Sequence, residues 1–148
     1  MIIEALKKLN KTEEEANGSL LERSDSMNCN YEVGVADGIY FNFLDDEEVA
    51  KFRKQITTKP FKIVDFILRT VYHYIKPDGK RASLRSDFQF LRFIFDSDDS
   101  FQIFVHHFRG ARWMPLNELI QKITTKISFE TEKRKLGPVN ILEIRGHY

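Results

Sequence analysis

Apolar and polar side chains alternate with a period of two over several stretches of the chain, which is the spacing of β-strands. The clearest stretch is residues 87–108, where a run of Asp and Ser at 96–100 separates two alternating segments. Residues 31–36 and 39–44 alternate in the same way around Asp37-Gly38, a pair that favours a tight hairpin turn. The pattern therefore predicts two antiparallel β-hairpins.

Other stretches carry apolar residues at helical spacing. Asp45 is a favourable N-cap, and the carboxylates after it would meet the positive end of a helix dipole. A second helix is predicted over residues 61–76, because polar residues share the period on the opposite side, although Ile, Val, Phe and Tyr there favour a strand by propensity. Pro115 suits the first turn of a third helix, and the chain opens on a short amphipathic helix.

Together with a loop at residues 80–86 and a last strand at 139–145, these elements follow the order α, ββ, αα, ββ, α, β. That order predicts an α+β fold, a two-layer sandwich in which helices cover one face of an antiparallel or mixed sheet of about five strands. Residues 22–30 are polar and turn-rich, so we expect residues 1–30 to form a helical or mobile arm and residues 31–148 a single domain.

Composition narrows the class of protein. The chain has 148 residues, 42% hydrophobic and 30% charged, which suits one globular domain. The single cysteine, Cys29, excludes an internal disulfide and a cysteine-based zinc site, and no apolar run is long enough to cross a membrane, so we expect a cytoplasmic protein without membrane contact. Residues 61–148 hold 15 Lys and Arg against 10 Asp and Glu, which favours an acidic partner, or an ordinary solvated surface.

Catalytic chemistry has little support in the sequence. His106 and His107 are adjacent in a predicted strand, so they point to opposite faces and are not expected to bind one metal ion. No nucleophile elbow and no glycine-rich phosphate loop is present, and we expect no cofactor. The alternative is a small enzyme in which His106 or His107 acts on an anionic substrate held by Arg109 or Arg112.

The end of the 87–108 hairpin combines cations with aromatic rings, which can hold phosphates and stack on bases. This favours a non-catalytic module that binds single-stranded nucleic acid or a protein partner through the sheet face and the basic C-terminal part. Both faces of the hairpin are apolar, so the N-terminal arm or a second copy in a homodimer would cover the second face. The predicted binding residues are Lys80, Arg81, Arg85, His106, His107, Arg109, Arg112 and Trp113. For the turn at Gly110 and for Trp113, a purely structural role in leaving the sheet and closing the core is the competing interpretation.

Overall fold

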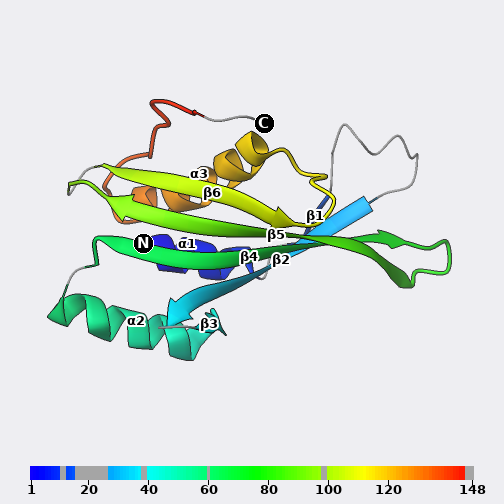
Figure 1. Ribbon diagram of the computed structural model, residues 1–148, viewed down its shortest axis with the longest axis horizontal. Helices are drawn as coiled ribbons and strands as arrows, with labels where there is room; N and C mark the ends of the chain where they lie inside the picture. The colour runs from blue at the N-terminus through cyan, green and yellow to red at the C-terminus, as the bar shows by residue number, and fades with distance from the viewer. Residues whose placement is uncertain (11–12, 16–26, 38–39, 60, 98–99, 146–148) are drawn as a thin grey trace.

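The computed structural model describes the chain except residues 11–12, 16–26, 38–39, 60, 98–99 and 146–148 (Figure 1). The described residues form an α+β fold, as predicted, with helices on one face of an open antiparallel sheet. Its helices are α1 (Ile2–Leu9), α2 (Asp46–Thr58) and α3 (Leu116–Lys133). Its strands are β1 (Glu13–Glu15), β2 (Met27–Asp37), β3 (Tyr40–Phe43), β4 (Ile63–Ile75), β5 (Arg81–Phe95) and β6 (Phe101–Arg109).

The strand order is β1-β2-β4-β5-β6, and β3 pairs with the same edge of β2 as β1. A gap therefore remains on that edge between residues 28–30, which pair with β1, and residues 34–37, which pair with β3. Asn10, directly after α1, fills this gap. Its side chain donates a hydrogen bond to the Leu44 carbonyl oxygen at 2.8 Å and accepts one from the Val33 backbone N–H. The end of α1 is thus tied to the sheet.

The hydrophobic core lies between the sheet and the pair α1 and α3, which pass behind the sheet in Figure 1. Every second residue of the central strands faces these helices, as expected for a sheet covered on one side. Burying each large apolar side chain there contributes about 1.5–3 kcal/mol. The fully buried core residues include Leu6, Leu9, Tyr31, Val33, Phe66, Leu68, Leu91, Phe93, Leu119, Ile123 and Ile127.

The prediction of a helix over residues 61–76 is wrong, because this segment is β4 (Ile63–Ile75). It pairs with β5 along its whole length on one side and with β2 over residues 66–74 on the other. Val64 and Leu68, which also fit a helical spacing, face the core, whereas Val71 lies on the opposite face. A central strand has apolar residues on both faces. The helical spacing in the sequence combined residues from the two faces, so it resembled the apolar side of a helix.

Three other boundaries differ from the prediction. Residues 80–86 were predicted as a loop, but β5 begins at Arg81 and continues the pairing with β4. Residues 139–145 are not in a strand, and the Ser128 hydroxyl holds the start of this segment by donating to the Val139 carbonyl oxygen at 3.1 Å. The strand predicted over residues 31–36 is longer in the structure, since β2 begins at Met27 and contains the buried Cys29. The first helix ends at Leu9 and packs in the core.

Both predicted hairpins are present as β2–β3 and β5–β6. The pairing of Asp37 with Tyr40 confirms the position of the first hairpin, although Gly38 lies outside the described residues. The Asp45 cap is also confirmed, since its carboxylate accepts a hydrogen bond from the Glu48 N–H at 2.9 Å. The local turn and cap signals in the sequence were therefore sufficient at these places.

Glu4 links all three helices. Its carboxylate accepts a hydrogen bond from Arg53 on α2 at 2.8 Å, lies 3.6 Å from the guanidinium of Arg134 at the end of α3, and pairs with the Met1 ammonium at 2.6 Å. Burial would raise the pKa of Glu4, but the hydrogen bonds from the ammonium and from Arg53 outweigh it and lower the pKa from 4.5 to about 2.

This depressed pKa predicts an acid-sensitive contribution to stability. Because the folded state binds the proton less readily than the unfolded state, the contribution is full above pH 4.5 and is lost as the pH falls toward 2. We expect Glu4→Gln to lower the free energy of unfolding at pH 7 by about 1–2 kcal/mol and to flatten its decline below pH 4.5. Urea unfolding over a pH series measures both, with the exposed Glu132→Gln as control. The same acid decline in Glu4→Gln and in the unmodified protein would contradict the prediction.

Candidate functional site

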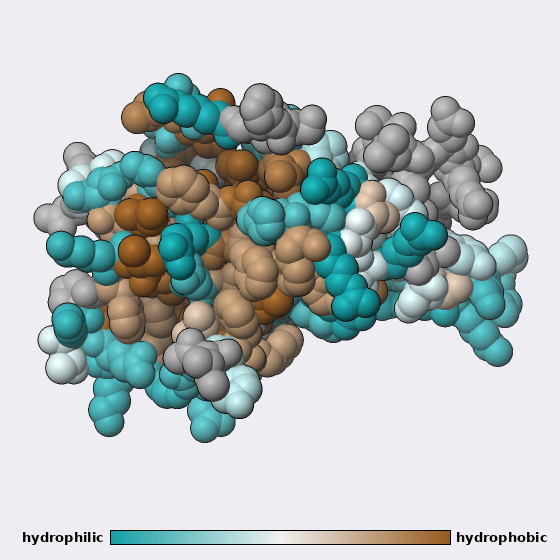
Figure 2. Space-filling model, viewed as in Figure 1, coloured by the Kyte–Doolittle hydropathy of each residue, from teal (hydrophilic) through white to brown (hydrophobic). Residues whose placement is uncertain are grey.

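The face of the sheet opposite α1 and α3 is open in the described part of the chain. Figure 2 views this face and shows an apolar patch at its centre, bordered by polar groups. Phe43 and Phe104 on the patch are 58% and 53% exposed, which is unusual for large aromatic side chains. A monomer rarely exposes a contiguous patch of this kind unless it binds something. The aromatic residues of the open face are Phe41, Phe43, Phe88, Phe90, Phe104 and Phe108.

Four of these rings form a continuous row across the sheet. The ring centroids of Phe41 on β3 and Phe90 on β5 are 5.8 Å apart. Phe90 stacks on Phe108 of β6 at 4.2 Å with an interplanar angle of 19°, and Phe108 lies 5.8 Å from Phe88. We call Phe41, Phe90, Phe108 and Phe88 the aromatic row. The row leads from β3 to β5 and β6 and returns to β5, and its rings Phe41, Phe90 and Phe108 are exposed.

Two local features of the backbone create the row. The register of β5 and β6 shifts so that Phe88 faces Arg109 while Gln89 faces His107, which leaves Phe108 as an extra residue in a β-bulge. Gly34 on β2 has no side chain, and a Cβ there would lie 3.0 Å from the Ile67 Cγ2 and 3.3 Å from the Phe41 Cβ. The bulge brings Phe108 to the row, and the glycine leaves the space that Phe41 occupies.

Arginines surround one end of the aromatic row. The guanidinium carbons of Arg69 and Arg109 each lie 5.7 Å from the centre of the Phe88 ring, within the range of cation–π attraction. Arg69 also pairs with Glu32 at 3.0 Å and donates a hydrogen bond to the Ser86 hydroxyl oxygen at 3.3 Å. This end of the open face is therefore both aromatic and cationic.

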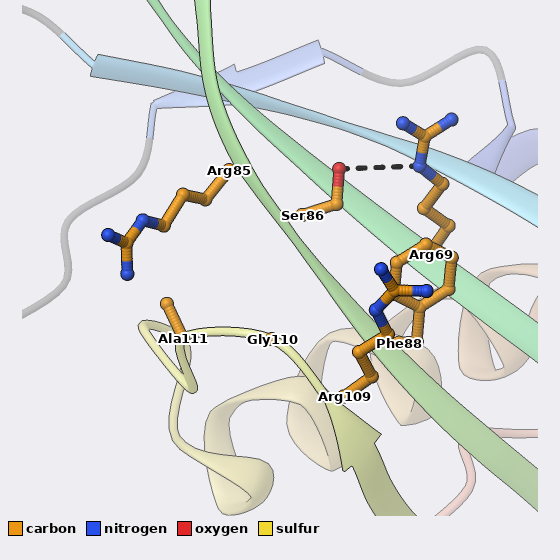
Figure 3. Close-up of a pocket in the computed structure, with 7 residues that line it drawn as sticks. All are labelled: Arg69, Arg85, Ser86, Phe88, Arg109, Gly110 and Ala111. Atoms are coloured by element: carbon orange, nitrogen blue, oxygen red, sulfur yellow. Dashed lines mark hydrogen bonds between the residues drawn. The ribbon is translucent and has the colours of Figure 1, made fainter.

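A hollow of about 450 Å³ adjoins this end (Figure 3). Figure 3 shows Arg69 and Arg109 with the Phe88 ring on one side of β5, and Arg85 on the other side beside Ala111. Among the residues that the structure describes, Glu32 is the one carboxylate that pairs with any of the three arginines. We call this space the arginine hollow, and it is lined by Arg69, Arg85, Ser86, Phe88, Arg109, Gly110 and Ala111.

The buried face of the same strands carries a polar cluster centred on Asp87, whose side chain is fully buried. Its carboxylate accepts a hydrogen bond from the Tyr72 hydroxyl at 2.9 Å and from the backbone N–H groups of Arg112 at 2.7 Å and Trp113 at 3.1 Å. Burial, and then the negative charge of Asp87, raise the pKa of Tyr72, so its hydroxyl remains a donor. The carboxylate thus holds the loop between β6 and α3 against β5.

His107 completes this cluster. The Arg112 Nε donates to the His107 Nδ1 at 3.1 Å, and an arginine side chain has no acceptor, so Nδ1 must accept. The His107 proton is then on Nε2, which donates to the Asp87 Oδ1 at 3.2 Å. Both ring nitrogens are engaged, and this arrangement leaves His107 no free lone pair with which to take a proton from a substrate.

The structure separates the predicted binding residues into four places. Arg85 and Arg109 line the arginine hollow, and His106 is exposed on the open face, opposite to the buried His107. The Asp87 cluster is bonded to the buried His107, the half-buried Trp113 and the exposed Arg112. Lys80 and Arg81 lie where the chain turns from β4 into β5, outside the arginine hollow and the Asp87 cluster.

The sequence interpretation missed several residues of the site, namely Arg69, Ser86, Phe88, Phe90 and Phe41. A strand assignment for residues 63–75 would have placed Arg69 two residues from Ile67 and Val71 on one face of the sheet. The bulge at Phe108 had no such signal in the sequence, because it depends on how β5 and β6 pair.

The fold and the site define a class: an open-faced α+β protein with an aromatic and cationic surface on its uncovered sheet. Comparison with protein-family models, with curated proteins and with solved structures finds no match for this chain. Within the described ranges, no three His, Cys, Asp or Glu side chains come together as a metal site, and no helix is long and apolar enough to cross a membrane.

Proposed function

We propose that this protein is a non-catalytic module that binds single-stranded nucleic acid on the open face of its sheet. The aromatic row with two arginines over Phe88 is the observation that carries the proposal. Bases stack on exposed aromatic side chains regardless of sequence, and each stacked base contributes about 1–3 kcal/mol. Arginines beside the row are in position to meet the phosphates that link the bases.

The position of the charges favours nucleic acid over a protein partner. Three arginines line the hollow beside Phe88, and among the described residues Glu32 is the one carboxylate that pairs with any of them. This excess of positive charge suits the phosphates of a nucleic acid. His106, exposed on β6 and paired in register with Phe90, adds a polar group within the row. A duplex keeps its bases stacked on each other, so the rings would select single strands.

Removing rings from the row provides the test. We expect the double variant Phe90→Ala, Phe108→Ala to weaken binding of a single-stranded 12-nucleotide RNA or DNA by about 10-fold or more, because stacked bases lose their support. Binding of the unmodified protein should weaken as the salt concentration rises. In Arg109→Gln, the slope of log affinity against log salt concentration should decrease by about the value of one phosphate contact. Fluorescence anisotropy of labelled, 5′-hydroxyl oligonucleotides at 50 and 200 mM NaCl measures both effects.

Phe129→Ala is the matched control, since Phe129 is 60% exposed but lies on α3, outside the open face. Arg112 is left intact because its side chain is bonded to His107. Absence of binding to any single strand at 50 mM salt would overturn the proposal. Sedimentation experiments test the alternative of a homodimer. A dimer that is disrupted in the Phe90→Ala, Phe108→Ala variant would show that the open face of the 87–108 hairpin binds a second copy of the chain.

A further inference from the structure

We infer that the arginine hollow binds a phosphate monoester, and specifically the terminal phosphate of the bound strand. The assignment to a strand end rests on the proposed function. The presence of a phosphate site does not, since it follows from the charges and donors of the hollow alone.

Charge is the first reason. Three arginines line the hollow, Arg69 and Arg109 from one side of β5 and Arg85 from the other, and among the described residues Glu32 balances one of these charges. The remaining charge of about +2 matches a phosphate monoester, which carries about −1.5 to −2 at pH 7, better than a phosphodiester, which carries one negative charge. Arginine is also the cation whose planar fork best fits phosphate oxygens.

The neutral groups of the hollow suit the same ligand. The Ser86 hydroxyl oxygen accepts a hydrogen bond from Arg69, which leaves its own proton free to be donated to an anion. Gly110 packs so closely on β5 that a Cβ would lie 2.3 Å from the Ser86 carbonyl oxygen, so the loop at residues 110–111 forms a firm wall beside the hollow. Arg85 approaches from the other side of β5 (Figure 3).

The position of the hollow points to the end of a strand. Phe88 is the last ring of the aromatic row and also lines the hollow. A phosphate held there would belong to the nucleotide at the end of the stacked segment. Recognition of that end would favour strands that carry a terminal phosphate over strands that end in a hydroxyl.

The test compares otherwise identical 12-nucleotide single strands that carry a 5′-phosphate, a 3′-phosphate or neither. We expect one phosphorylated end to bind about 10-fold more tightly than the strand with two hydroxyl ends, and inorganic phosphate to remove this advantage by competition. In the Arg85→Gln variant, the strand with the phosphorylated end and the strand with two hydroxyl ends should bind with equal affinity. Arg92→Gln should preserve the difference between the two affinities, because Arg92 pairs with Asp65 on the open face and lies outside the hollow.

Titration with inorganic phosphate at constant ionic strength, followed by the amide NMR signals of Gly110 and Ala111, tests the site without nucleic acid. Saturable shifts that Arg85→Gln removes would support the phosphate site even if no oligonucleotide binds, an outcome that overturns the proposed function alone. Equal affinities for all strand ends together with unshifted amides would overturn the inference and leave the proposed function standing. Amide shifts with inorganic phosphate, together with equal affinities for all strand ends, would show that the site binds free phosphate. This result would overturn the assignment to a strand end.

Discussion

Replacement of Asp87 by asparagine is expected to lower the free energy of unfolding by about 3–5 kcal/mol. The carboxylate is fully buried and accepts four hydrogen bonds, from Tyr72, His107 and the N–H groups of Arg112 and Trp113. An asparagine has one acceptor oxygen, so its amide nitrogen would replace the other oxygen and would face two of these donors. At this buried position those donors would lose their hydrogen-bond acceptor. Few single changes in a domain of this size should cost as much.

Urea unfolding followed by the fluorescence of Trp113, the single tryptophan of the chain, measures this loss. Asp96→Asn makes the same chemical change at an exposed carboxylate that accepts one hydrogen bond from Gln102, and we expect it to cost less than about 1 kcal/mol. If Asp87→Asn does not fold, Tyr72→Phe removes one donor from the cluster and should cost about 1–2 kcal/mol. Losses for Asp87→Asn and Asp96→Asn of the same size would contradict the role of the buried cluster.

The Asp87 cluster also connects the core to the proposed site. The two backbone N–H groups that it holds belong to the loop that leaves β6, and Gly110 and Ala111 at the start of that loop line the arginine hollow. Arg112 has a positive φ of 54°, a conformation that a non-glycine residue adopts only where its surroundings hold it. Hydrogen bonds on the buried face therefore position the wall of a hollow on the exposed side.

The sequence was sufficient wherever a signal is local. The 87–108 hairpin, the hairpin around Asp37-Gly38 and the cap at Asp45 each depend on neighbouring residues, and each is present. The strand β4 was missed because its two apolar faces are used by different partners, the core on one side and the open face on the other. Which face a residue joins depends on pairing with β2 and β5, and that information is distant in the sequence.

The same limit applies to the site. Adjacency in sequence grouped His106, His107, Arg112 and Trp113, but alternation along β6 and the turn after it divide them between an exposed face and a buried cluster. Arg85 and Arg109 line one hollow from opposite sides of β5, which depends on the pairing of β5 with β6 and on a bulge that the local sequence does not predict. Asp87 had the appearance of an ordinary polar residue at the start of a strand, and its burial follows from the loop that packs on it.

Gly110→Ala is expected to lower the free energy of unfolding by about 3 kcal/mol or more, from a clash added to backbone strain. Gly110 has a φ of +116°, which residues with a side chain rarely adopt. A Cβ there would lie 2.3 Å from the Ser86 carbonyl oxygen and 2.5 Å from the Asp87 Oδ1, both of them fixed in β5. Urea unfolding gives the size of the loss.

Gly79→Ala separates the two causes, because Gly79 has a φ of +83° but no heavy atom within 4 Å of the added Cβ. It should cost about 1–2 kcal/mol, the strain of the positive φ alone. Since the clash must push the loop away from β5, Gly110→Ala should also remove the preference for a phosphorylated strand end, whereas Gly79→Ala should keep it. Equal losses of stability in the two variants would show that the loop does not pack on β5 as closely as the Gly110 contacts require.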